Sequence, residues 1–293
     1  MQYLIYILVY PIIWLISILP FRLLYFFSDC IYILVYYVIG YRKKIVRENI
    51  ALALPHLSEA ERSQIEKKFF HHLCDTFLEM AKTLTISNKE IESRYKFTNF
   101  DVYLELEKKQ KSIALVCAHY ASYEWAVSMN LYIQHRGVGI YKRIRNKYFD
   151  KLVRDIRSRF KAHLVTTKST IPTIRDNYLN KVLCVYGFAS DQSPKLESTF
   201  HWGSFMGMEV PMHTGAEMLA KKYDMNVVFM QTRKVKRGYY EATFKLLSEN
   251  TQEVPNYEIT DRFMKLVEAQ ILEAPEYYLW THKRWKHRRP NTN

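Results

Sequence analysis

The first forty residues of the chain are almost entirely apolar. Residues 1–21 carry no formal charge, and residues 23–40 contain Asp29 as their only charged side chain. About 20 apolar residues are enough for a helix to cross a bilayer. We therefore expect a membrane anchor over residues 1–40, built as two spans or as one span with an interfacial helix, and a second domain over residues 41–293.

Helical and strand patterns alternate along the rest of the chain. Three runs are short and almost continuously apolar, as in strands buried on both faces: residues 112–118, 182–188 and 227–230. Helical patterns occur at residues 58–82, where Ser58 and Glu61 form a capping box, and at residues 214–223 and 261–273. This order predicts an α/β fold with a mostly parallel sheet flanked by helices. Residues 239–246 alternate in polarity and favour an antiparallel edge strand.

The charge of the chain indicates an anionic partner. The formal net charge is +14, and the basic residues of 42–47 follow the apolar segment directly, which is typical of its cytoplasmic side. Residues 142–161 hold nine Lys or Arg against two acids, and residues 283–289 hold five with no acid. We interpret these stretches as surfaces for an acidic lipid or an acidic protein, with solvated helix faces as the alternative. The apolar segment and the lack of a recognised nucleic-acid module argue against nucleic acid.

One His and one Glu follow the carboxyl end of a predicted strand, which is where open α/β sheets usually form their active sites. His119 follows the first buried strand, and Glu124 is five positions later. The two side chains can converge if His119 ends the strand and Glu124 lies in the first turn of the next helix. An imidazole oriented by a carboxylate takes a proton from an alcohol that attacks a carbonyl group. We therefore predict that His119 is a general base and that Glu124 holds its ring.

Two other groups of residues have alternative interpretations. Cys117 shares a strand face with His119, so it is either an acyl-accepting nucleophile or a packed thiol. His71, His72 and Asp75 have helical spacing, so they form either a metal site or a polar helix face. We favour the structural interpretation for both groups. The four cysteines of the chain lie far apart in sequence, as expected of a reducing compartment.

The segment His119-Tyr-Ala-Ser-Tyr-Glu124-Trp125 resembles the His-x4-(Asp/Glu) motif of glycerolipid acyltransferases. It is most similar to the form found in the bacterial lipid A biosynthesis (lauroyl/myristoyl) acyltransferase family. Further blocks resemble that family in the same order: 49–61, 141–146, Asp191-Gln192, Thr214-Gly215 and 278–286. The resemblance spans nearly the whole chain. It departs at the second block, where this chain has Tyr141-Lys142-Arg143 in place of Tyr-Arg-Pro.

The resemblance implies an O-acyltransferase at the inner membrane, with its catalytic domain in the cytoplasm. It implies transfer of a fatty acyl chain from a thioester, on acyl carrier protein, to a hydroxyl of a lipid A precursor, with no metal or cofactor. His119 and Glu124 would be catalytic, and the substrate-binding residues would be Lys142, Arg143, Asn146 and Asp191. Arg143 or backbone N–H groups would bind the oxyanion. The alternatives are acylation of another lysolipid, glycolipid or amino-acid lipid, and a non-catalytic protein that binds anionic lipid.

Overall fold

The computed structural model describes residues 2–289. The helices are α1 (Gln2–Ile18), α2 (Phe21–Ile33), η1 (Leu34–Ile39), α3 (Lys43–Ala53), α4 (Glu59–Lys82), α5 (Asn88–Arg94), α6 (Phe100–Lys108), η2 (Trp125–Leu131), α7 (Lys147–Arg157), η3 (Ser158–Phe160), α8 (Thr170–Leu179), η4 (Leu196–Ser198), α9 (Gly215–Lys222), α10 (Glu258–Glu273) and η5 (Pro275–Tyr277). The strands are β1 (Tyr95–Phe97), β2 (Ile113–Cys117), β3 (Arg136–Tyr141), β4 (His163–Thr166), β5 (Cys184–Ala189), β6 (Trp202–Phe205), β7 (Met208–Pro211), β8 (Asn226–Lys236) and β9 (Tyr239–Ser248).

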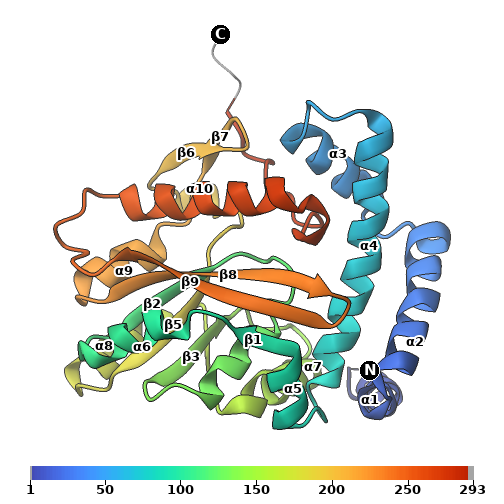
Figure 1. Cartoon of the computed structure of the whole chain (residues 1–293), viewed down its shortest axis with the longest axis horizontal. Helices are drawn as coiled ribbons and strands as arrows, with labels where there is room; N and C mark the ends of the chain where they lie inside the picture. The colour runs from blue at the N-terminus through green and yellow to red at the C-terminus, as the bar shows by residue number, and fades with distance from the viewer. Residues whose placement is uncertain (1, 290–293) are drawn as a thin grey trace.

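Seven strands form one twisted sheet in the order β1-β9-β8-β2-β5-β3-β4 (Figure 1). Neighbouring strands run parallel except for the β8–β9 hairpin, so the predicted α/β class is confirmed. The predicted edge position of residues 239–246 is wrong, because β1 pairs with β9 on its outer side. The three-residue β1 is too short to give a periodic signal in the sequence.

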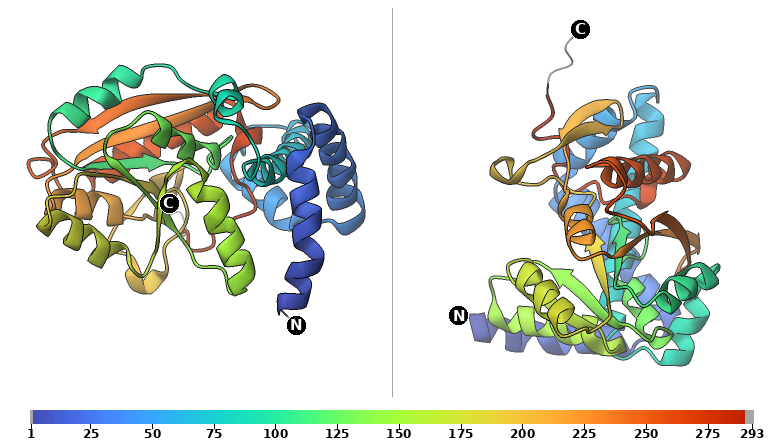
Figure 2. Two further views of the ribbon diagram at one scale, coloured as in Figure 1. Left: turned by 90° about the horizontal axis from the view of Figure 1, so that it is seen from below. Right: turned by 90° about the vertical axis from the view of Figure 1, so that its left-hand side faces the viewer.

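Helices cover both faces of the sheet. In Figures 1 and 2, α10 and the small β6–β7 hairpin lie on one side of the β8–β9 ribbon, and α5, α6, α7 and α8 lie on the other. The central strand β2 is buried on both faces, as its apolar sequence predicts. The capping box is also present: the Ser58 side chain accepts a hydrogen bond from the Glu61 amide, and α4 begins at Glu59.

The amino-terminal helices expose large apolar side chains. The stretch Phe21–Ile39, which joins α2 and η1, has 19 residues and a mean hydropathy of 1.5, and it is long and apolar enough to cross a membrane. The helix α1 is shorter, with 17 residues. The second apolar segment is therefore long enough to span a bilayer, and the choice between two spans and one span with an interfacial helix stays a prediction. In Figure 1, α1 is seen end-on while α2 stands beside α4, so the two helices run in different directions.

Polar contacts fix α2 to the rest of the protein. Ser28 of α2 donates a hydrogen bond of 2.7 Å to the buried carboxylate of Asp75 in α4. Arg237, in the turn between β8 and β9, binds the same carboxylate at 3.0 Å and also reaches Asp29 of α2. A guanidinium that joins two carboxylates in this way ties α2, α4 and the β8–β9 hairpin together.

The residues weighed as a metal site belong to this polar network. His71 Nε2 lies 2.8 Å from Asp29 Oδ1, and His72 Nδ1 lies 3.1 Å from the Lys234 ammonium. Lys234 also lies 3.6 Å from Asp75. His71 and His72 therefore face different partners, in agreement with the interpretation as a polar face that packs against neighbouring elements.

Candidate functional site

The carboxyl ends of β2 and β5 bring His119 and Asp191 together. The two strands are parallel neighbours, and their last residues, Cys117 and Ala189, are paired. His119 and Asp191 each lie two residues beyond these paired ends, so they meet at the same edge of the sheet. His119 Nδ1 lies 2.7 Å from Asp191 Oδ1, and the same oxygen accepts the His119 backbone N–H at 3.1 Å.

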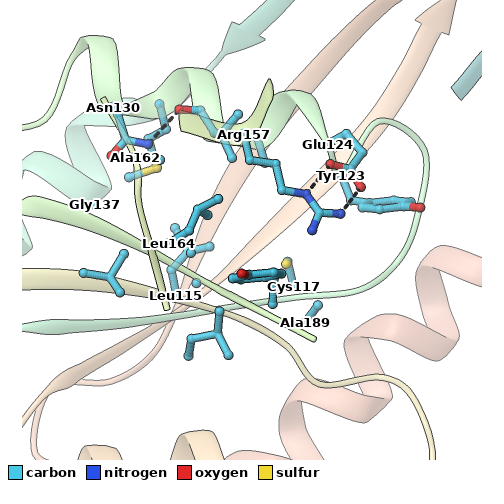
Figure 3. A pocket seen from close by; sticks show the side chains of 18 of the residues that line it. Leu115, Cys117, Tyr123, Glu124, Asn130, Gly137, Arg157, Ala162, Leu164 and Ala189 are labelled. Atoms are coloured by element: carbon cyan, nitrogen blue, oxygen red, sulfur yellow. Dashed lines mark hydrogen bonds and ion pairs between the residues drawn. The ribbon is translucent and has the colours of Figure 1, made fainter. Parts of the chain in front are cut away.

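Glu124 does not hold the His119 ring, contrary to the prediction. The Arg157 guanidinium of α7 binds the Glu124 carboxylate through two hydrogen bonds, of 2.9 Å from Nε and 2.6 Å from Nη2 (Figure 3). The chain turns sharply after His119, with a positive φ of 49° at Ala121, and Glu124 lies at the N-terminal end of η2 without a capping hydrogen bond from its side chain. This turn directs the carboxylate to α7, while the tertiary neighbour Asp191 takes the place beside the imidazole.

The electrostatics of the pair favour an ionised carboxylate beside a titratable imidazole. Burial lowers the pKa of His119, but the charge and hydrogen bond of Asp191 outweigh it and raise the pKa above its ordinary value. Glu124 adds to this increase, and Arg157 opposes it. Burial tends to raise the pKa of Asp191, yet the contacts with His119 lower it overall. Since Asp191 binds Nδ1, the Nε2 atom remains for a substrate.

A cavity of about 510 Å³ extends from His119 along the sheet. Its floor is made by alternate residues of β2 and β5, which lie on one face of the sheet: Leu115, Cys117, Val185, Gly187 and Ala189. The helices η2 and α7 cover it, and Figure 3 shows Arg157 extending to Glu124 at its polar end. The volume falls within the range of small-molecule pockets, and the mostly apolar lining suits a hydrocarbon chain.

Glycines leave this space open. A Cβ atom added to Gly187 would meet only the Val138 carbonyl oxygen, at 3.8 Å, so the cavity lies above it. Gly137 and Gly139 of β3 also line the cavity. Their surroundings are closer, because a Cβ on Gly137 would lie 1.5 Å from the Asn130 side chain. Gly187 is thus the one of these three positions where a larger side chain can enter the cavity.

The remaining predicted residues fall into different environments. Lys142 lines the cavity, whereas the largely exposed Arg143 lies 4.0 Å from Asp150. Asn146 caps α7, since its side-chain oxygen accepts the backbone N–H groups of residues 148 and 149. Cys117 faces the cavity, and burial together with Asp191 raises the pKa of its thiol to about 12. A thiol of this kind is a poor nucleophile, which agrees with a packing role.

Arg157 was placed among the surface cations by the sequence, and the structure corrects this. Of the nine basic residues at 142–161, Arg157 alone is not exposed. Its spacing offered a signal: Val153 and Arg157 lie four residues apart on one face of α7, and both line the cavity.

The carboxyl-terminal segment, residues 277–285, holds the loops that carry the pair. The Ala121 N–H donates to the Tyr277 carbonyl, and the Leu279 N–H donates to the His119 carbonyl, at 2.9 and 3.0 Å. On the other side, Ser193 Oγ donates to the Arg284 carbonyl at 2.5 Å. Residues distant in sequence thus fix both loops.

A half-buried imidazole paired with a buried carboxylate, at the end of an apolar cavity, is an arrangement that can take a proton from a group bound there. The family model described as bacterial lipid A biosynthesis acyltransferase matches residues 1–287 of the chain. The chain therefore belongs to the bacterial lipid A biosynthesis acyltransferase family.

Two relatives agree with this assignment. The chain is 25% identical over 278 residues, 94% of this chain and 90% of the relative, to the lipid A biosynthesis lauroyltransferase of Escherichia coli (strain K12). It is 22% identical over 249 residues, 84% of this chain and 78% of the relative, to the lipid A biosynthesis acyltransferase of Haemophilus influenzae (strain ATCC 51907 / DSM 11121 / KW20 / Rd).

Proposed function

We propose that the protein transfers a fatty acyl chain from an acyl thioester to a hydroxyl of a lipid A precursor. The observation that carries the proposal is the position of the His119–Asp191 pair at the end of the apolar cavity. The cavity takes the acyl chain, which places the thioester carbon next to the imidazole. The acceptor hydroxyl then approaches Nε2 from the open side.

The chemistry needs only groups of this chain and the two substrates. The acceptor oxygen attacks the thioester carbon, and its proton passes to His119 Nε2 as the new C–O bond forms. Asp191 stabilises the imidazolium through Nδ1–H. The tetrahedral intermediate then collapses, the C–S bond breaks, and the imidazolium returns the proton to the leaving thiolate. The products are an ester and a free thiol, and the imidazole is neutral again.

Arg157, which lines the cavity, takes the oxyanion role that was expected of Arg143 or of backbone N–H groups. Its Nε and Nη2 atoms are occupied by Glu124, and its side chain lines the cavity near His119. The ion pair fixes the guanidinium, which leaves Nη1 to stabilise the negative charge that develops on the carbonyl oxygen. Glu124 acts through Arg157 and is a positioning residue.

Removing either member of the Glu124–Arg157 pair should lower kcat by roughly 10²–10³, the effect of losing one oxyanion donor. The double variant Glu124→Gln with Arg157→Met should be no slower than Arg157→Met alone, because Glu124 has no further role once the guanidinium is absent. Steady-state kinetics of the three variants test this. Multiplicative losses would show that Glu124 acts separately, for example on the His119 ring.

The acceptor and the location are tested together in cells. Mass spectrometry of total lipids should show one additional acyl chain on lipid A precursors when the protein is present, and no addition with His119→Ala. We propose that the protein acts at the inner membrane with its catalytic part in the cytoplasm, so it should remain in the membrane pellet after carbonate extraction. Acylation of another lysolipid would replace the proposed acceptor but keep the chemistry.

The cationic face of α7 favours acyl carrier protein as the donor. Lys147, Lys151 and Arg154 are exposed on this helix, and carrier proteins of fatty acid synthesis are small and acidic. Such steering weakens as salt shortens the Debye length, which is about 8 Å at 0.15 M. We expect Lys147→Glu with Arg154→Glu to raise KM for the carrier at low salt, with kcat unchanged and the effect reduced at high salt.

The matched control for the donor prediction is Arg175→Glu with Lys181→Glu, which makes the same charge change around α8. It should leave KM for the carrier unchanged. Arg157 is excluded from this test because it lines the cavity. A coenzyme A donor that performs equally well at every ionic strength would contradict the role of α7.

A further inference from the structure

Arg284 is a buried cation without a carboxylate in direct contact. Its residue is 1% exposed, and within residues 2–289 no Asp or Glu oxygen lies within 4.0 Å of its guanidinium. A buried charge is strongly destabilising unless its surroundings compensate for it. Compensation for the charge of Arg284 therefore requires a buried negative charge more than 4.0 Å from the guanidinium.

The groups that touch Arg284 are only weakly polar. Nη1 lies 3.4 Å from Ser193 Oγ and Nη2 lies 3.2 Å from the Met212 sulfur, while the Phe205 ring lies 5.0 Å from the guanidinium carbon. Nε has no hydrogen-bond partner among the described residues. These contacts hold the guanidinium in one place without neutralising it.

Asp191 is the complementary buried charge. Its Oδ2 atom is buried and has no hydrogen-bond partner among residues 2–289, since the bonds with His119 use Oδ1. Ser193, two residues after Asp191, contacts Arg284 with both its hydroxyl donor and acceptor sites. Burial lowers the pKa of Arg284, and Tyr278 followed by Asp191 opposes this change. The two charges thus interact across the Ser193 loop.

We propose that Arg284 is a positioning residue that keeps Asp191 ionised and holds His119 in its basic form. The inference rests on the proposed role of His119 as the base. With Arg284 present, the buried group of Arg284, Asp191 and neutral His119 has no net charge. Without it, an uncompensated carboxylate beside the imidazole retains a proton up to a higher pH.

Other charged or titratable groups face this pair from each neighbouring element. Glu124, just before η2, raises the pKa of His119, and Arg157 of α7 lowers it. His213, before α9, and His282, in the carboxyl-terminal segment, have pKa values lowered chiefly by burial, that of His282 to about 4. Tyr123, Tyr278 and Cys117 complete the surroundings, and burial raises the pKa of all three. The Tyr278 hydroxyl also interacts with Asp191. Near pH 7 these five groups are neutral, so Arg284 is the cation on the Asp191 side.

The test is the pH profile of kcat/KM together with an NMR titration of the His119 ring. Arg284→Met should move the acidic limb of the profile, and the pKa of His119, upward by about one unit. The Arg284 cation stabilises the Asp191 carboxylate with a neutral His119, which has a net charge of −1, more than it stabilises the carboxylate with a protonated His119, which has no net charge. Removing the cation therefore favours the protonated imidazole. Arg284→Lys keeps the charge and should retain the wild-type limb. The matched control Arg289→Met removes a cation from the same segment, where it pairs with Glu209, and should leave the limb in place.

The outcomes separate this inference from the proposed function. An unshifted His119 titration in folded Arg284→Met would overturn the inference even if the enzyme is active, and so would an equal shift in Arg289→Met. A wild-type protein without acyltransfer would contradict the proposed function, while the titration would still report on Arg284. If Arg284→Met fails to fold, Asp191→Asn in the same chain should restore folding, because neither charge is then unpaired. Failure of that double variant to recover would overturn the inference.

Discussion

Asp191→Asn should lower kcat by about 10⁴, close to the loss expected for His119→Ala. The carboxylate accepts Nδ1–H at 2.7 Å, whereas an amide can donate to Nδ1 and so stabilise the tautomer that has its proton on Nε2. That tautomer cannot accept a proton from the acceptor hydroxyl, and comparable substitutions in catalytic triads cost about this factor. The measurement is single-turnover transfer from a labelled acyl thioester.

Cys117→Ser is the matched control for the dyad variants. It changes a side chain of the same cavity wall, two residues from His119, and it should retain most activity. A folded but inactive Cys117→Ser variant, alongside an active His119→Ala variant, would mean that the acyl group passes through the thiol. Thermal unfolding should be compared for all three variants, since the carboxylate also binds the His119 backbone.

Gly187→Leu should make the enzyme selective for shorter acyl chains. The leucine side chain would enter the cavity where a Cβ has only one neighbour, at 3.8 Å, and displace about three methylene groups of the substrate at roughly 0.8 kcal/mol each. We therefore expect kcat/KM for chains that fill the cavity to fall by about 50-fold, since 1.4 kcal/mol is a tenfold change. Competition between donors of graded chain length measures this directly.

The variant contains its own control, because chains shorter than the remaining cavity should react at nearly the wild-type rate. Equal losses for every chain length would indicate damage to the sheet and not a filled cavity. Unchanged selectivity for acyl-chain length in a folded variant would show that the acyl chain does not bind in this cavity. The proposed function would then lose its main support, which is the position of the cavity beside the His119–Asp191 pair.

The sequence predicts the elements of the site better than their partners. The apolar run of β2 and the position of His119 at its end are local features, and both agree with the structure. The Asp191 contact depends on the pairing of β2 with β5, whose residues lie about seventy positions apart. The register between distant strands leaves no periodic signal, so the nearby Glu124 was chosen as the partner of the ring.

The sequence also does not predict which of the basic residues are buried. Charge counting treats the cations at 142–161 alike, yet α7 turns Arg157 into the cavity and leaves its neighbours in solvent. Arg284 is similar, since it lies in a basic segment but is buried. Only the packing of a helix or a loop against the sheet determines which cation is taken out of water, and that packing depends on residues far away in the chain.

The contacts of α2 with Asp75 and Arg237 have a further consequence under the proposed location at a membrane. A catalytic domain on a flexible tether would sample many heights and tilts over the lipid. Here the buried Asp75 carboxylate accepts hydrogen bonds from Ser28 of α2 and from Arg237 of the β8–β9 turn, so these contacts oppose a change in the angle between the apolar helix and the sheet. If α2 lies in the membrane, in line with the proposed function, these contacts hold His119 near one depth and one orientation. An acceptor is then selected partly by how far its hydroxyl lies from the headgroup plane, a form of positional selectivity that requires no contact with the rest of the lipid.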